Sequence, residues 1–264
     1  MYYLGPEGSY SHEVSLLFSN LIKKKVKIVS KQTISEVFDE VLKNGIGVVP
    51  IENSREGPVN ETLDNLFKKQ VYVKYEIEKK IDIVLASNKK IKNVEEIRRI
   101  YSNYYAIQES RNVLNDLNKE IIQVESTSKA ALLASKDLKG AALCSKFAAN
   151  LYNLIILKNN IQDGLNITRF VVISSKISKR GKKTMLFFIV EHKPGSLYKA
   201  LKEFYKRKIN LTMIYSRPLK EIAWNYYFYV EIEGSLKEKR VKKALKELIK
   251  NTVDMKIKGS FIKI

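Results

Sequence analysis

The chain of 264 residues has little of the chemistry that many enzymes depend on: it contains one cysteine, Cys144, and two histidines, His12 and His192. A single cysteine excludes a disulfide framework and any cysteine-based metal site. Because the two histidines lie far apart in the sequence, a histidine metal cluster or a histidine-centred catalytic triad is not expected. Cys144 ends the apolar run 141–144, so we expect a packed thiol in a buried strand rather than a nucleophile.

Long apolar runs are also missing. No stretch reaches about 18 apolar residues, the length that a membrane-spanning helix needs. The N-terminus enters a strand at once, so no signal peptide is predicted and the expected location is the cytoplasm. The length allows one large domain or two ordinary ones, each with its own core.

Acidic residues are outnumbered: 48 lysines and arginines face 28 acidic residues, for a formal net charge of +20. Clustered basic residues would indicate nucleic-acid binding, but here they are dispersed over element ends and polar helix faces. We interpret them as a solvated surface whose positive field also collects an anionic ligand. A nucleic-acid-binding protein is the alternative that charge alone supports. The basic groups lie at 23–25, 89–90, 180–183 and 237–243.

What the chain does have is a set of polar loops that join strand ends to helix starts. The run from Pro50 to Asp64, PIENSREGPVNETLD, follows the apolar strand 46–49 and precedes a helix. Free backbone N–H groups and the helix dipole at such a junction attract carboxylates or phosphates. Three further segments are built alike: LGPEGSYS at 4–11, ESTSKAA at 125–131 and IQDGLNITRF at 161–170.

Strands and helices alternate over residues 1–175, which predicts an α/β architecture. A basic linker is expected at 176–183, followed by a ferredoxin-like βαββαβ domain at 184–264. The expected strands are 2–4, 26–29, 46–49, 71–77, 81–86, 121–124, 141–144, 155–157, 170–173, 185–190, 210–215, 224–232 and 255–262. The expected helices begin at 11, at 33 and after 59, and occupy 93–101, 110–117, 126 onward, 146–152, 196–205 and 237–249.

These segments resemble, in order and spacing, the prephenate dehydratase family, and residues 184–264 resemble the ACT regulatory domain. The resemblance implies two α/β lobes with a cleft between them, as in type II periplasmic binding proteins, within a catalytic domain at 1–175. It implies a lyase that converts prephenate to phenylpyruvate, water and carbon dioxide in phenylalanine biosynthesis. No chorismate mutase helices precede the first strand, so a monofunctional enzyme is expected.

The resemblance also assigns the site residues. Thr168 takes the role of a hydrogen-bond donor to the leaving hydroxyl of prephenate. Phe170 is an expected apolar neighbour of the departing ring carboxylate. Two roles stay open for Arg169, which alternates to the other face of its strand: pairing with a structural acid, or contacting the substrate. The expected donors to the carboxylates are Ser9, Asn53, Ser54, Ser126 and Thr127.

An effector site for L-phenylalanine is implied by HKPGSL at 192–197 and INLTMIYSRP at 209–218. The sequence departs from the family pattern at Tyr215, where glutamate is usual, and at Ser196, where alanine is frequent. It departs again at Asn103 and Tyr104, where histidine and proline are frequent. The expected effector residues are Gly195, Ser196, Leu197, Asn210, Ser216, Arg217 and Pro218.

Neither a cofactor nor a metal is expected, because Glu52, Glu61 and Asp64 lie near a helix start, where acids suit the dipole. Homodimers or homotetramers are the expected assemblies. Two alternatives stay open beside the dehydratase of prephenate. One is an arogenate dehydratase, and the other is a non-catalytic amino-acid sensor whose two lobes close on a ligand without chemistry.

Overall fold

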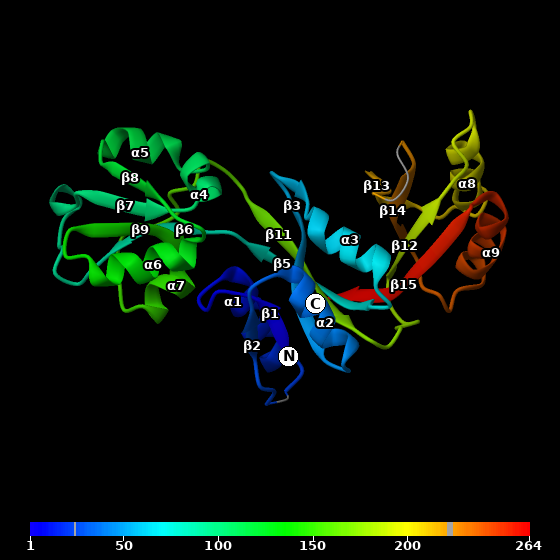
Figure 1. The fold of residues 1–264 in the computed structure, drawn as a ribbon, viewed down its shortest axis with the longest axis horizontal. Coiled ribbons are helices and arrows are strands. Elements are labelled where there is room, and N and C mark those ends of the chain that lie inside the picture. The colour runs from blue at the N-terminus through cyan, green and yellow to red at the C-terminus, as the bar shows by residue number, and fades with distance from the viewer. Residues whose placement is uncertain (24, 221–223) are drawn as a thin grey trace. The chain divides into compact units, whose positions relative to one another are not determined.

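A computed structural model describes residues 1–23, 25–220 and 224–264 of the chain. These residues form two compact units, each assembled from three segments of the sequence (Figure 1). Unit 1 comprises Met1–Val37, Val48–Pro58 and Glu78–Phe170. Unit 2 comprises Phe38–Gly47, Val59–Ile77 and Val171–Ile264. The chain therefore passes between the units several times.

The first part of the chain alternates strands with helices, as the sequence predicts. β1 and β2 pair in parallel, with Tyr2 opposite Val29. The hydroxyl of Thr33 accepts a hydrogen bond from the Glu36 N–H at 3.1 Å and so begins the second helix. The elements are β1 Tyr2–Leu4, α1 Tyr10–Leu21, β2 Val29–Lys31, α2 Ile34–Leu42, β3 Ile46–Asn53, β4 Gly57–Pro58 and α3 Asn60–Lys68.

Unit 1 also contains a separate five-stranded sheet in the order β10-β6-β9-β7-β8. Alternate residues of β6 face opposite sides of it: Leu85 belongs to one core cluster with Leu114 of α5, and Ala86 belongs to another with Ala130 of α6. The sheet is thus covered by helices on both faces. Its elements are β6 Ile83–Ser87, β7 Arg99–Ser102, α4 Tyr104–Gln108, α5 Arg111–Leu117, β8 Glu120–Gln123, α6 Thr127–Lys136, β9 Gly140–Ser145, α7 Lys146–Leu151 and β10 Ile155–Lys158.

The predicted helix at 93–101 is wrong. The structure has a single 3-10 turn at Val94–Glu96, and β7 begins at Arg99. β7 lies between β9 and β8 and is parallel to both, with Ile100 fully buried. The spacing of Val94, Ile97 and Tyr101 imitates a helix, but strand pairing on both sides decides the conformation of this short segment.

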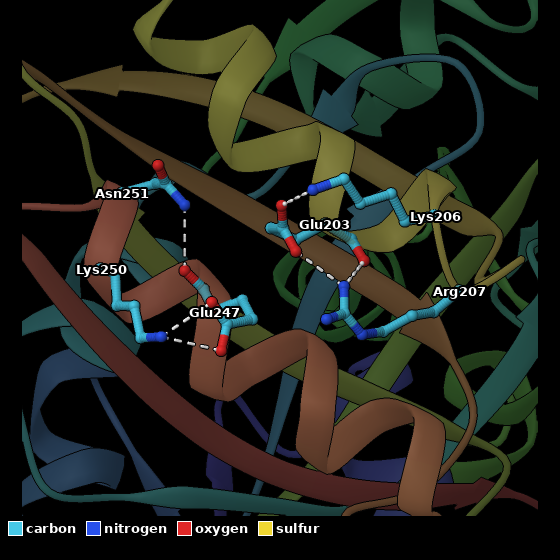
Figure 2. A network of polar contacts seen from close by, with 6 residues as sticks. All are labelled: Glu203, Lys206, Arg207, Glu247, Lys250 and Asn251. Carbon is cyan, nitrogen blue, oxygen red and sulfur yellow. Dashed lines mark hydrogen bonds and ion pairs between the residues drawn. The ribbon is translucent and has the colours of Figure 1, made fainter.

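The C-terminal part of unit 2 has the predicted βαββαβ order. Its sheet runs β13-β14-β12-β15, and the apolar faces of α8 and α9 cover one side with Phe204 and Leu248. In Figure 2 the last turns of these helices carry Glu203, bound by Lys206 and Arg207, and Glu247, bound by Lys250. The elements are β12 Lys183–Ile189, α8 Ser196–Tyr205, β13 Leu211–Pro218, β14 Tyr226–Glu233, α9 Lys239–Leu248, a 3-10 turn Ile249–Asn251 and β15 Asp254–Lys263.

Two further strands complete the described fold, and each has residues in both compact units. β5 (Tyr72–Lys80) pairs in parallel with the end of β15, where Ile262 lies opposite Tyr75. β11 (Ile167–Ser174) leads from unit 1 into residues 176–182. The α/β fold-class prediction, with its lobed N-terminal part and ferredoxin-like C-terminal part, is confirmed. The domain limits 1–175 and 184–264 stay a prediction, since the compact units combine segments from both ranges.

Candidate active site

Thr168 and Asn53 meet where β11 begins and β3 ends. The side-chain amide of Asn53 donates from Nδ2 to Thr168 Oγ1 at 2.9 Å, and Thr168 is only 8% exposed. Asn53 is fixed in turn, because its Oδ1 accepts hydrogen bonds from the backbone N–H groups of Arg55 and Glu56. Among the described residues, the Thr168 hydroxyl finds no acceptor for its own proton. That proton is therefore available to a ligand.

The same amide continues a chain of buried polar groups. Asn53 Nδ2 also donates to Asn166 Oδ1 at 2.6 Å, and Asn166 Nδ2 donates to Glu109 Oε1 at 2.5 Å. Asn166 is 3% exposed and Glu109 is 5% exposed. Consecutive hydrogen bonds polarise one another in a medium of low dielectric constant. A carboxylate at one end of this chain thus orients both amides and directs an N–H at the Thr168 oxygen.

Other predicted residues surround Thr168 with different contacts. Ser54 Oγ accepts from the Ile167 N–H at 3.0 Å, so Ser54 ties β11 to the loop after β3. Arg169 Nη1 donates to Glu52 Oε2 at 2.5 Å, which is the contact with a structural acid that one interpretation of the sequence anticipated. Phe170 is 2% exposed and contributes to the core.

The loop after β1 lies against the second half of unit 1. Ser128 Oγ and Tyr152 Oη both donate to the Glu7 carbonyl. Gly8 has a φ of 84°, and a Cβ atom there would lie 2.6 Å from Ser128 Oγ, so this position requires glycine. Ser9 caps α1, accepting from the His12 N–H and donating to the Leu4 carbonyl. The predicted role of Ser9 as a ligand donor thus competes with an existing hydrogen bond.

His12 is packed rather than open to a ligand. Its ring stacks on Tyr3, with centroids 4.8 Å apart, and its Nδ1 accepts the Gly8 N–H. Burial lowers the pKa of His12, so the imidazole is neutral at neutral pH. Cys144 is fully buried and burial raises its pKa to about 12, as expected for a packed thiol.

Ser126 and Thr127 lie at the start of α6. Ser126 Oγ caps the helix by accepting the Lys129 N–H at 3.1 Å, and among the described residues the hydroxyl of Thr127 has no hydrogen-bond partner. A pocket of about 900 Å³ opens beside Ser126, with Lys129, Lys31 and residues 5–7 in its walls. Neither Asn53 nor Thr168 lines it. The structure thus brings Asn53, Ser54 and Thr168 together, and Ser126 lines a pocket whose walls include none of these three residues.

A further pocket of about 370 Å³ lies in unit 2 at the start of α8. Ser196 and Leu197 line it, as the sequence predicts for an effector site, together with Glu191 and Phe228. Five other predicted effector residues do not line this pocket: Gly195, Asn210, Ser216, Arg217 and Pro218. Over the described ranges, no group of three or more histidine, cysteine, aspartate or glutamate side chains could hold a metal ion.

Sequence reasoning missed Glu109 and did not select Asn166. Asn166 stands in the segment IQDGLNITRF, where an amide two residues before Thr168 was a usable signal. Glu109 gives none, because its partner Asn166 is 57 positions away and only the fold joins them.

Comparison with known proteins gives consistent matches over the chain. A family model described as prephenate dehydratase matches residues 1–178, and one described as the ACT domain matches residues 184–250. A bifunctional chorismate mutase/prephenate dehydratase of Aquifex aeolicus is 42% identical over 269 residues, covering 99% of this chain and 73% of that protein. A prephenate dehydratase of Methanocaldococcus jannaschii is 38% identical over 268 residues, covering 98% and 96%. The structure of prephenate dehydratase from Arthrobacter aurescens in complex with L-Phe superposes with a TM-score of 0.88 at 25% identity, covering 99% of this chain and 89% of that one.

Proposed function

The chain belongs to the prephenate dehydratase family, and from that premise we propose that it is a carbon–oxygen lyase that converts prephenate to phenylpyruvate, water and carbon dioxide. In this reaction the C4 hydroxyl leaves as water while the ring carboxylate departs as carbon dioxide. The electron pair of the broken carbon–carbon bond enters the ring, which becomes aromatic. The enzyme must therefore assist the leaving oxygen at neutral pH.

Thr168 is the proposed donor to that oxygen. A threonine hydroxyl is too weak an acid to give up its proton early, so it acts through a hydrogen bond that strengthens as negative charge develops on the leaving group. The observation that carries this role is the bond from Asn53 Nδ2 to Thr168 Oγ1. Because the oxygen accepts from Asn53, the remaining O–H is oriented and polarised for donation.

Glu109 and Asn166 are positioning residues in this proposal, since they act on Thr168 only through Asn53. For the substrate carboxylates, the proposed donors are Thr127, Ser126 and the first N–H groups of α6, together with Ser54 and with Ser9, whose hydroxyl would exchange its hydrogen bond to the Leu4 carbonyl for one to the substrate. Helix N-termini bind anions through such groups. Arg169 supports the site by holding β11 against Glu52 of β3, and Phe170 supplies an apolar surrounding for that strand.

The test is to incubate the purified protein with prephenate at neutral pH and to follow phenylpyruvate by absorbance. Rapid product formation is expected. Arogenate is assayed in parallel, because it differs by an ammonium group in place of the keto group, and faster turnover of arogenate would identify the alternative dehydratase. Binding of both compounds without turnover would replace the proposal by a ligand sensor.

Regulation by L-phenylalanine is the second part of the proposal. The pocket at the start of α8 offers Glu191 for an ammonium group, the helix N-terminus at Ser196 for a carboxylate, and Leu197 with Phe228 for an aromatic ring. The relative from Arthrobacter aurescens was solved with L-Phe. Replacing Ser196 by aspartate should weaken inhibition by phenylalanine while basal turnover persists. Normal inhibition of both Ser196→Asp and Arg217→Ala would locate the effector site elsewhere.

The remaining proposals concern organisation. Residues 1–175 are the proposed catalytic domain and residues 184–264 the proposed ACT domain; this division is supported by the two family models, which match residues 1–178 and 184–250. Homodimers or homotetramers in the cytoplasm are proposed, and light scattering at several protein concentrations tests the assembly. No helix within the described parts of the chain has the length and apolar character needed to cross a membrane.

A further inference from the structure

A pocket of about 580 Å³ in unit 2 lies apart from both sites described above. It opens between β5, the segment 177–180 and the end of β15. Its walls carry four cationic side chains and no acidic one: Lys74, Lys179, Arg180 and Lys237. Pockets of this size hold small molecules of the dimensions of a nucleotide.

The four charges are not neutralised by the protein. Within the described ranges, none of these side chains forms an ion pair or a hydrogen bond. Lys183, close by in sequence, behaves differently, because its Nζ lies 3.5 Å from Glu76 and 3.8 Å from Glu231. Like charges that converge on a concave surface raise the local positive potential and attract anions from solution.

The backbone that carries Lys179 and Arg180 is held in place. The Ser260 N–H donates to the Ser178 carbonyl at 2.7 Å, and the Lys182 N–H donates to the Phe261 carbonyl at 3.0 Å. Gly181 packs so closely on β15 that a Cβ atom would lie 2.3 Å from the Phe261 oxygen. The segment predicted as a linker is thus fixed along β15. The backbone of its two cationic residues is already ordered, so less conformational entropy is lost when a ligand binds.

The chemistry of the lining selects the ligand. Arginine binds two phosphate oxygens at once through its planar fork, while lysines act as mobile point charges. Ile177, Ile262 and Tyr75 add apolar and aromatic surface beside the cations. We propose that this pocket binds a polyphosphate group, either that of a nucleoside triphosphate or inorganic polyphosphate. The site is independent of the proposed dehydratase activity.

Isothermal titration of the full chain with ATP, with AMP and with inorganic tripolyphosphate tests the proposal at about 150 mM KCl, where charges on a flat surface are largely screened. Saturable binding of ATP, at least about tenfold tighter than that of AMP, is expected because the four cations of the pocket contact more phosphate groups in ATP. If tripolyphosphate binds as tightly as ATP, inorganic polyphosphate is the source. If ATP binds tighter, the apolar wall holds the nucleoside.

Two double variants separate this pocket from the general positive charge. Lys179→Glu with Arg180→Glu should weaken ATP binding by at least about tenfold. Lys242→Glu with Lys243→Glu reverses the same number of charges on the exposed face of α9, outside the pocket, and should change binding by less than about twofold. Equal weakening in both variants, absence of saturation, or tighter binding of a short DNA duplex than of ATP would each overturn the proposal.

Discussion

Arg217 and Asp64 form a bidentate ion pair, with Nε 2.8 Å from Oδ1 and Nη2 2.9 Å from Oδ2. Tyr227 Oη donates to the same Oδ1 at 2.6 Å, and Lys220 Nζ lies 3.1 Å from Oδ2. Burial alone would raise the pKa of Asp64, but the hydrogen bonds from these groups lower it to about 2. The pair joins helix α3, which follows the Asn53 loop, to strand β13.

Replacing Asp64 by asparagine should lower the free energy of unfolding at pH 7 by about 2 kcal/mol, because Arg217 loses its charged partner. A folded-state pKa below the ordinary value means that the carboxylate stabilises the fold above about pH 4. This contribution, about 1 to 2 kcal/mol after solvent screening, is lost as the pH falls toward 2. Urea unfolding of both proteins between pH 2 and 7 measures it.

The matched control is Glu247→Gln, which removes an exposed ion pair with Lys250 and should cost less than about 0.5 kcal/mol. A difference between wild type and Asp64→Asn that stays constant down to pH 2 would contradict the assignment of the low pKa to Asp64.

Thr168→Ala should lower kcat by about 100-fold or more, while KM for prephenate changes little, because the hydroxyl acts mainly in the transition state. Thr168→Ser keeps the hydroxyl and should retain a large share of the turnover. Steady-state kinetics of the two variants provide the comparison, and circular dichroism verifies their folding. Turnover at the wild-type level in the alanine variant would remove Thr168 from the mechanism.

Glu109→Ala should reduce kcat by roughly 10- to 100-fold, because Asn166 and Asn53 lose the acceptor that orients them and Thr168 shifts. Glu109→Gln retains an acceptor for Asn166 and should recover most of the loss. Glu95→Ala, on the exposed 3-10 turn, is the control for removing an acid from unit 1. Equal activity of the alanine and wild-type proteins would show that the hydrogen-bond chain does not affect turnover.

Lys258 is a buried cation, and its effect on the stability of the fold depends on pH. It is 4% exposed, its Nζ donates to the Lys69 carbonyl, and burial with the nearby charge of Lys256 lowers its pKa to about 8. Below pH 8 the Lys258 ammonium is charged in the folded state, and the free energy needed to bury that charge lowers the stability of the fold. That cost falls between pH 8 and the ordinary value of 10.5, so this residue destabilises the fold most at low pH.

Lys258→Met should therefore raise the free energy of unfolding by about 1 to 3 kcal/mol at pH 7, after the lost hydrogen bond to Lys69 is counted. The gain should shrink as the pH rises to 10. Urea unfolding at both pH values measures it, with the exposed Lys242→Met as the control. A methionine variant less stable than wild type at pH 7 would show that the hydrogen bond outweighs the cost of burying the charge.

Local patterns predicted the elements best where one face is apolar over several turns. Helix α8 has the predicted limits, and α9 falls within the predicted range 237–249, with Val241 and Leu248 buried. Strand β7 was missed because its four residues are too few to display a period of two, and its buried Ser102 reads as polar. Its conformation depends on β8 and β9, which lie later in the sequence.

The site divides in the same way. The motifs marked Asn53 and Thr168, which the fold brings within hydrogen-bond distance. The contact between Arg217 and Asp64 was not predicted, since the two residues are separated by 153 positions and belong to different sequence motifs. Glu109 was missed for the same reason. Long-range pairs of polar side chains need the fold before they can be recognised.

Helix α3 and strand β5 share unit 2 with the C-terminal sheet: Phe67 stacks on Tyr227 with centroids 4.2 Å apart, and β5 pairs with β15. A C-terminal part with such partners cannot be exchanged by itself without losing these contacts. A gene fusion that replaced only residues 184–264 by the equivalent part of a distant relative would remove Arg217 and Tyr227, the partners of Asp64 and Phe67. A functional exchange would therefore have to include residues 59–77, which carry the partners of this C-terminal sheet.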